Sequence, residues 1–193
     1  GAYQQEKPAY LNDNTGCRPD FVRLNNQLDY WLFKKVHART VVIGKNDYLF
    51  EQSYIDEYFG LDFVGAAPLR KEAIITKKIQ DTLTALGKTF VFVFAPSKAY
   101  YYSDELPGSF CKMHHSQKSN YEVFKRLCDS TGINYIDFNG WFMSQKDTTK
   151  NLLFDRQSTH WTVYGSLIAA DSFIRYLEQK RHEKLPELNV TDI

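Results

Sequence analysis

The chain has 193 residues, of which 43% are hydrophobic and 24% are charged, a balance typical of a globular protein with a buried core. Its formal net charge of +1, from 24 Lys and Arg against 23 Asp and Glu, lacks the positive excess that nucleic acids or anionic membranes attract. We therefore expect no nucleic-acid partner, and no apolar run approaches the roughly 20 residues that span a bilayer. Aromatic residues make up 16% of the chain, which is typical of a Phe-filled core with Tyr at its rim and also of a wet binding cleft.

The first part of the chain predicts a polar leader, a helix and a strand. Residues 1–19 are polar and broken by Gly and Pro, and they predict a loose leader. The leader opens on Gly1 in place of Met, which indicates a trimmed start, so the lack of a signal peptide does not set the location. Apolar residues at helical spacing predict a helix over 20–37 with Asp20 as its N-cap. The β-branched run over 40–43 predicts a strand.

Two further pairs of a helix and a strand follow in the middle of the chain. Helical spacing predicts a helix over 68–86, and the uninterrupted β-prone run over 89–95 predicts a strand buried on both faces. A polar, irregular stretch over 97–119 comes next. It separates this strand from a helix over 120–131 and a strand over 133–138.

The final helix begins at either Thr162 or Ser166, and its apolar stripe extends to Leu177. Helices that alternate with buried strands are typical of an α/β fold with a largely parallel sheet flanked by helices. We expect one domain over 20–185, followed by a tail over 186–193. Ligands of open parallel sheets bind in the loops beyond the carboxyl ends of the strands. Three segments fall there: residues 97–98, the loop after Phe138, and the residues around His160.

Residues 158–161, Ser-Thr-His-Trp, form the most informative motif of the chain. An imidazole in a loop just before a helix can act as a general base, because its pKa lies near neutrality. The residue two positions earlier can orient this imidazole, and Asp is the usual choice because its charge stabilises imidazolium. Ser158 holds that position here, where it can form a hydrogen bond but supplies no charge. An ordinary structural role for His160 in the loop is the alternative interpretation.

Three segments, in order along the chain, carry a resemblance to a known family. They are residues 41–50, residues 94–107 with Pro96 and Lys98 after a strand, and residues 158–166. Together they are similar to the AlgX/AlgJ branch of SGNH-hydrolase-like proteins, which are O-acetyltransferases of exopolysaccharides with a DHHW-like motif. The resemblance covers roughly the whole predicted domain.

The resemblance implies a circularly permuted SGNH-hydrolase-like fold with a Ser-His-Asp triad. In such a triad the serine is acetylated and passes the acetyl group to a sugar hydroxyl, the His removes the serine proton, and the Asp fixes the His tautomer. By the resemblance, His160 falls on the catalytic His and Ser158 on the catalytic Asp, and we expect both at the catalytic centre. The spacing leaves open whether Asp155 supplies the missing charge.

The resemblance also implies the partners and the location of the protein. The expected substrate is a polysaccharide or an acetylated glycan, and the expected acetyl donor is a membrane-bound O-acyltransferase. No metal or organic cofactor is implied. The protein is then expected in the periplasm or another extracytoplasmic space, with its signal or anchor removed.

The nucleophilic serine is the part of the pattern that we do not find. The family carries it in a Gly-Asp-Ser-like block after the Asp-x-His block, whereas only a helix and a charged tail follow Trp161 here. Residues 170–173 match that block superficially, but Ser172 lies within a helical pattern and lacks the sharp turn that exposes a nucleophile. We therefore expect Ser172 to be a decoy, the SGNH-hydrolase-like fold to be incomplete, and catalysis by this chain to be weak or absent.

Four residues are candidates for contact with a sugar: Lys98, Tyr102, Arg156 and Trp161. Lys98 follows a buried strand, and its ammonium group is expected at the edge of the sheet; a solvated lysine is the alternative. Tyr102 ends a run of three tyrosines that suits aromatic contact with a glycan or packing at a strand edge. Trp161 serves equally to pack the loop.

The histidines and cysteines outside these motifs suggest no further chemistry. His114 and His115 lack a third ligand at metal-binding spacing. Of the cysteines Cys17, Cys111 and Cys128, the last two can form a disulfide in an oxidising compartment, or all three can be buried thiols.

Two functions from different classes follow. The first is an O-acetyltransferase or acetylesterase with a degenerate triad. The second is a glycan-binding or scaffolding module that keeps the fold without catalysis. Turnover of an acetyl ester that depends on His160 separates them.

Overall fold

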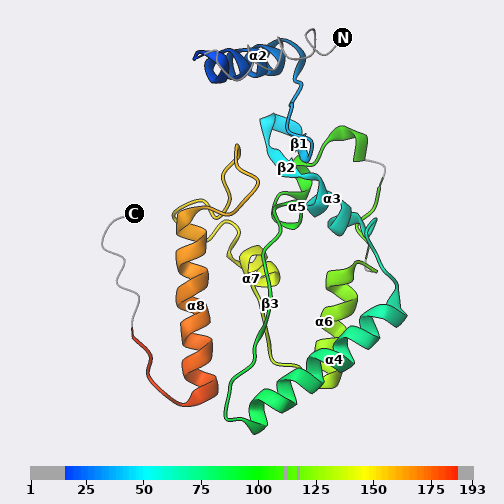
Figure 1. Cartoon of the computed structure of the whole chain (residues 1–193), viewed down its shortest axis with the longest axis vertical. Coiled ribbons are helices and arrows are strands. Elements are labelled where there is room, and N and C mark those ends of the chain that lie inside the picture. The colour runs from blue at the N-terminus through cyan, green and yellow to red at the C-terminus, as the bar shows by residue number, and fades with distance from the viewer. Residues whose placement is uncertain (1–15, 111–112, 117, 187–193) are drawn as a thin grey trace, which may run out of the picture. The chain divides into compact units, whose positions relative to one another are not determined.

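The computed structural model describes residues 16–110, 113–116 and 118–186 of the chain (Figure 1). Contacts within it divide the chain into two units, Gly1–Arg39 and Thr40–Ile193. The boundary lies between Arg39 and Thr40, and the helix that precedes it buries none of its residues.

Helix α2 (Arg18–Phe33) lies within the described part of the first unit, residues 16–39. It begins two residues before the predicted Asp20, because Pro19 near its start already has the backbone angle of a first helical turn. It ends earlier than predicted, at Lys34, whose left-handed conformation (φ 52°) breaks the helix. Its apolar side chains are exposed, among them Phe33 at 72%.

The second unit opens with an antiparallel hairpin. Strand β1 (Val41–Ile43) pairs with β2 (Leu49–Glu51) across a 3₁₀ turn, η1 (Lys45–Asp47). Helix α3 (Gln52–Phe59), which the sequence pattern did not indicate, follows β2 directly and ends at Gly60 in the left-handed region. Phe50 and Ile55 are fully buried, so the hairpin and α3 share a core.

Helices α4 (Ala66–Ala85) and α6 (Asn120–Thr131) lie side by side (Figure 1). Both agree closely with the predicted helices. The buried side chain of Gln80 connects α4 to the turn after α6: its Nε2 donates to Gly132 O (3.0 Å), and its Oε1 accepts from Asn134 N–H (2.6 Å). This clamp fixes the turn that leads into the next strand.

Strands β3 (Phe92–Phe94) and β4 (Tyr135–Asp137) form a parallel pair, with Phe92 opposite Tyr135. Both lie inside the predicted strands but are shorter. In the described part of the chain this is one parallel pair beside one antiparallel hairpin, and no larger parallel sheet is formed. Just before β4, the Asn134 carbonyl accepts from the Phe92 N–H (2.8 Å), whereas the Asn134 N–H donates to the Gln80 side chain in place of a strand.

Short helices lie beyond the strands. Helix α5 (Lys98–Tyr101) follows β3, with the 3₁₀ turns η2 (Ser103–Glu105) and η3 (Gly108–Phe110) after it. Helix α7 (Phe138–Gln145) follows β4 directly. Where the pattern suggested a polar loop, the Asp137 carboxylate accepts the Gly140 N–H (2.9 Å) and starts a helix.

The last helix, α8 (Val163–Arg181), is capped by Thr162, the first of its two predicted starts. The Thr162 hydroxyl accepts the N–H of Gly165 at 2.9 Å. Ala169 of α8 packs in a core with side chains of α5, α7 and the preceding loop, including Phe142 and Phe154. Among the described residues, none of the helices has the length and apolar content needed to cross a bilayer.

Candidate functional site

Residues 155–160 form the tip of a loop whose base is closed immediately before α8. Phe154 and Trp161 form an antiparallel bridge across this base. The Thr162 N–H donates to Leu153 O (2.9 Å), and the Thr162 hydroxyl donates to Leu152 O (2.7 Å). The two ends of the loop therefore meet at Thr162, the residue that caps the helix, and we call residues 155–160 the His160 loop.

Gly165 allows α8 to approach the base of the His160 loop. A Cβ atom at this position would lie 2.8 Å from Leu153 O and 3.5 Å from Leu153 Cα. Both neighbours are backbone atoms, so a side chain at residue 165 would push the helix away from the loop.

Lys98 fixes the tip of the His160 loop through the backbone carbonyls of the loop. Its side chain is fully buried, and its Nζ donates to four backbone carbonyls: Leu49 (2.8 Å), Asp155 (2.6 Å), Arg156 (3.0 Å) and Ser158 (2.6 Å). Because an ammonium group has three N–H bonds, the four acceptors share them and leave none for another ligand.

The surroundings of this ammonium group suit a buried cation. The rings of Tyr48 and Phe50 lie 5.4 Å from Nζ, measured to their centroids. Burial lowers the pKa of Lys98 to about 8, and the negative charge of Asp155 opposes this effect. The sequence placed Lys98 at an open sheet edge, as a sugar contact or a solvated lysine. The structure instead encloses it, because backbone carbonyls from β2 and from the His160 loop replace water around the charge.

His160 lies at the end of the loop with its side chain exposed. Its backbone N–H donates to the Ser158 hydroxyl (3.2 Å), so that hydroxyl contacts the backbone of His160. Within the part of the chain that the structure describes, the imidazole makes no hydrogen bond or ion pair. Asp155 is exposed on the same loop but does not pair with the imidazole. The structure thus brings the predicted residues onto one loop without joining them into an acid–base pair.

The exposed side chains of the loop line a shallow hollow. Residues 155–158, Arg156 among them, line this hollow. The Arg156 carbonyl oxygen accepts from Leu49 N–H (2.9 Å) in addition to Lys98, so its backbone is held while its side chain is exposed. Of the predicted sugar contacts, Arg156 is the one that is clearly presented to solvent.

The aromatic candidates are packed to different degrees. Trp161 is half-buried, and its ring lies 5.8 Å from that of Phe142, so it packs the base of the loop. Tyr102 is half-buried and contacts the rings of Tyr48 and Tyr101, each at 4.8 Å. Tyr101 itself is buried. The tyrosine run is therefore mainly core, and only Tyr102 reaches the surface.

A polar network, which the motifs did not reveal, lies at the carboxyl ends of β3 and β4. The Asp137 carboxylate accepts from the Tyr121 hydroxyl (2.8 Å) and pairs with Lys125 (3.1 Å). Burial and the Asp137 charge raise the pKa of Tyr121. The Ser97 N–H donates to Asn139 Oδ1 (3.0 Å), and this bond connects the ends of the two strands. Polar residues directly after each strand were the signal for this network. The hydrogen bonds and the ion pair of this network join residues of the protein to one another.

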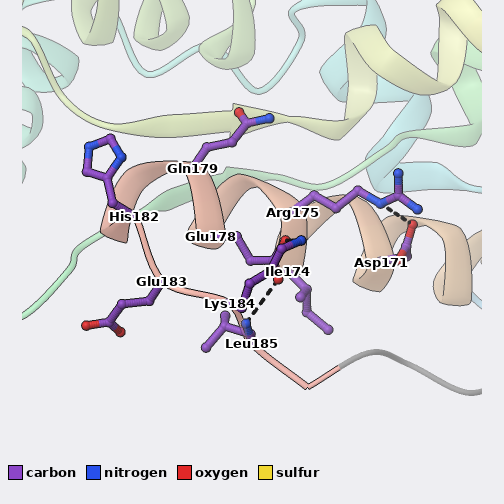
Figure 2. A pocket seen from close by; sticks show the side chains of 9 residues that line it. All are labelled: Asp171, Ile174, Arg175, Glu178, Gln179, His182, Glu183, Lys184 and Leu185. Carbon is purple, nitrogen blue, oxygen red and sulfur yellow. Dashed lines mark hydrogen bonds and ion pairs between the residues drawn. The ribbon is translucent and has the colours of Figure 1, made fainter.

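A second pocket lies away from the His160 loop, between the C-terminal half of α8 and residues 182–185 (Figure 2). Arg175 pairs with Asp171 (2.9 Å), and Glu178 accepts the N–H of Leu185 (3.0 Å); Figure 2 draws both contacts as dashed lines. The first contact lies within α8, and the second holds the segment after the helix against α8.

The remaining predicted residues lie outside the His160 loop. Ser172 lies within α8, as its pattern predicted, and not on an exposed turn. In the described ranges, no three His, Cys, Asp or Glu residues gather to bind a metal ion. Cys128 is a buried free thiol whose pKa is raised to about 11 by burial, and Cys17 is free and exposed. Cys111, the proposed disulfide partner of Cys128, lies outside the described residues.

Comparisons with known proteins agree with the sequence resemblance. The family model described as SGNH hydrolase-like domain, acetyltransferase AlgX, matches residues 41–192. A probable alginate O-acetylase AlgJ from Azotobacter vinelandii is 29% identical over 143 residues, which are 74% of this chain and 34% of that protein.

One solved structure shows the same similarity at the level of the fold. The O-acetyltransferase domain of Pseudomonas putida AlgJ matches with a TM-score of 0.55 and 24% identity over 76% of this chain and 50% of that one. Pseudomonas aeruginosa AlgX matches with a TM-score of 0.47 and 21% identity over 72% of this chain and 32% of that one. The chain thus spans half or less of the length of these relatives. The predicted SGNH-hydrolase-like fold is confirmed, and the chain belongs to the family of SGNH hydrolase-like domains of the acetyltransferase AlgX type.

Proposed function

We propose that this chain takes part in the O-acetylation of an extracytoplasmic polysaccharide, as an AlgX/AlgJ-like domain. Family membership over residues 41–192 supports the proposal, as do relatives that are named for alginate O-acetylation. The observation that carries it is the exposed imidazole of His160 on a loop whose backbone is fixed at its base and its tip. A catalytic base needs this combination of a fixed backbone and access to substrate.

In this reaction His160 acts as the general base. It takes the proton of a serine hydroxyl as that oxygen bonds to the acetyl carbon, and it gives the proton to the leaving alcohol as the ester bond breaks. A sugar hydroxyl then attacks the acetyl-serine and gives its proton to His160, which passes it to the serine oxygen as the acetyl-serine bond breaks. Ser158 holds the place of the triad acid but has no charge to stabilise the imidazolium. Replacement of the aspartate in a serine-protease triad costs about 10⁴ in kcat, so we propose weak or absent turnover for this chain. We assign no residue of the chain as the nucleophile.

The proposed substrate is a polysaccharide, which would meet the protein at the hollow beside residues 155–158. The exposed guanidinium of Arg156 can donate hydrogen bonds to sugar hydroxyls or carboxylates. Tyr102 and Trp161 expose only part of their rings and would contribute at the edge of such a site. A membrane-bound O-acyltransferase is the proposed acetyl donor, and the periplasm is the proposed location.

A second candidate function is non-catalytic binding of the glycan by the same surface. The bond between the Ser158 hydroxyl and the backbone of His160 favours it, because that hydroxyl is not directed to the imidazole. Under this alternative, the loop contacts sugar but transfers nothing.

Hydrolysis of a chromogenic acetyl ester separates the two functions. Under the enzymatic proposal, His160→Ala abolishes turnover and Ser158→Asp raises it. The control is His114→Ala, which changes another exposed histidine and should leave turnover unchanged. Binding of acetylated and unacetylated alginate by each variant is measured in parallel. Glycan binding that survives His160→Ala, with no turnover in any variant, would instead establish the binding module.

A further inference from the structure

We propose that Lys98 is a positioning residue for His160: its buried ammonium group holds the backbone of the His160 loop and so presents the imidazole to substrate. The inference rests on the proposed function for the role of His160, but the hold on the loop is testable without any activity. Lys98 contacts no part of the imidazole, so its effect passes through the backbone of residues 155–158.

The stem of Lys98 starts from a fixed point. Ser97, the preceding residue, is buried, and its N–H donates to Asn139 Oδ1 (3.0 Å) at the start of α7. The Lys98 carbonyl accepts from Tyr102 N–H (2.9 Å) within the turn of α5. The backbone of Lys98 is thus held on both sides, and its side chain is fully buried.

The ammonium group sets the direction in which the loop faces. Three carbonyls of the loop, from Asp155, Arg156 and Ser158, point to Nζ at 2.6 to 3.0 Å. The side chains of residues 155–157 are correspondingly exposed. Together with the closed base at Thr162, this arrangement fixes the backbone on either side of His160. The imidazole is therefore held outward on a backbone that is restrained at both ends.

A second bond connects the loop to β2 and provides a direct reporter. Leu49 N–H donates to Arg156 O (2.9 Å), while Gly44 N–H donates to Tyr48 O (2.7 Å) inside the same hairpin. If Lys98 holds the loop, release of the loop breaks the bond of Leu49 and leaves that of Gly44 in place. The two amides thus separate release of the loop from unfolding of the hairpin.

Amide hydrogen exchange in Lys98→Met tests the proposal, since Met has a similar length and no donor. We expect exchange at Leu49 to rise at least about tenfold while exchange at Gly44 stays within about twofold. Lys98→Arg keeps the charge, but its planar group does not fit four converging carbonyls, and we expect an intermediate rise. Lys146→Met is the matched control: that lysine also lies over tyrosine rings, yet pairs with Asp104 and does not contact the loop. Unchanged exchange at Leu49 in a folded Lys98→Met would overturn the proposal.

A measurement on the unsubstituted chain covers the case in which Lys98→Met does not fold. NMR of the lysine side chains below about pH 7 should show a slowly exchanging ammonium signal for Lys98, with couplings across hydrogen bonds to loop carbonyl carbons. A Lys98 signal that exchanges as fast as those of the exposed lysines would contradict the proposal.

Turnover of the acetyl ester then distinguishes this proposal from the proposed function. If both hold, Lys98→Met lowers kcat at least about tenfold and changes KM less than about twofold, because the base is displaced while the binding surface remains. If no variant hydrolyses the ester but exchange at Leu49 still rises, the enzymatic function fails and the hold on the loop stands.

Discussion

Glu57 on helix α3 gives the fold a pH dependence that a single substitution should remove. Its carboxyl is largely buried, and burial raises its pKa to about 7, with a further contribution from the negative charge of Asp62. The unfolded chain has no such burial, so there the same group titrates near the ordinary glutamate pKa of 4.5. The proposed change is Glu57→Gln, which keeps the shape and removes the ionisation.

The sign and the size follow from these two pKa values. Between about pH 4.5 and pH 7 the folded chain binds the Glu57 proton and the unfolded chain releases it, so the free energy of unfolding falls as the pH rises. The stability is fully present below about pH 4.5 and is lost as the pH rises through about 7. At about 1.4 kcal/mol for each unit, the loss is up to about 3 kcal/mol. We therefore expect Glu57→Gln to match the parent chain at acidic pH and to be more stable by up to about 3 kcal/mol above neutrality.

Urea unfolding followed by circular dichroism, at several pH values from about 4 to 8, measures this difference. The exposed Glu72 of α4 supplies the control, Glu72→Gln, which should follow the parent chain throughout. The comparison between variants cancels the titration of the other groups. Parallel profiles for the parent chain and Glu57→Gln would refute the argument, since they would mean that the carboxyl is ionised in the folded chain at neutral pH.

Two further predictions concern the base of the His160 loop. Gly165→Ala should lower the free energy of unfolding by about 1–2 kcal/mol, because contact of the new Cβ with Leu153 O at 2.8 Å outweighs the better helix propensity of Ala. The control is Gly108→Ala, whose Cβ meets no atom within 4 Å and which should not destabilise the chain. Equal effects of the two substitutions would exclude the contact as the cause. Thr162→Ala removes the cap of α8 and the bond to Leu152 O, and it should lower the melting temperature by an amount equivalent to about 1–2 kcal/mol. Calorimetry measures this shift, and no shift would show that neither bond contributes to stability.

The sequence was sufficient to predict the long helices. Helix α6 has the predicted bounds, and α4 differs by two residues or fewer at each end, because their apolar stripes are long and their ends carry turn residues. The cap of α8 was also one of the two predicted starts. The three short motifs, taken in their order along the chain, were sufficient to predict the family.

Short elements and buried polar groups could not be predicted in the same way. Helix α7 depends on one cap at Asp137 and contains a glycine, so it has no long apolar stripe to reveal it. The strands are shorter than their β-prone runs because pairing depends on a neighbouring strand, which local sequence does not specify. The enclosure of Lys98 is the clearest case: lysine is normally solvated, and only the fold brings carbonyls from β2 and from residues 155–158 around it.

The contacts that hold the His160 loop are made to its main chain, and this separates the course of the loop from the identity of its residues. Lys98 and the N–H of Leu49 bind carbonyl oxygens, which every amino acid possesses. Side chains at 155–157 can therefore be exchanged during evolution while the path of the chain is inherited unchanged. At residue 158 an aspartate would accept the same His160 N–H that the Ser158 hydroxyl accepts now, so gain or loss of the triad acid requires no rebuilding of the loop. A point substitution at residue 158 can therefore change the charge beside His160 while the path of the loop stays the same.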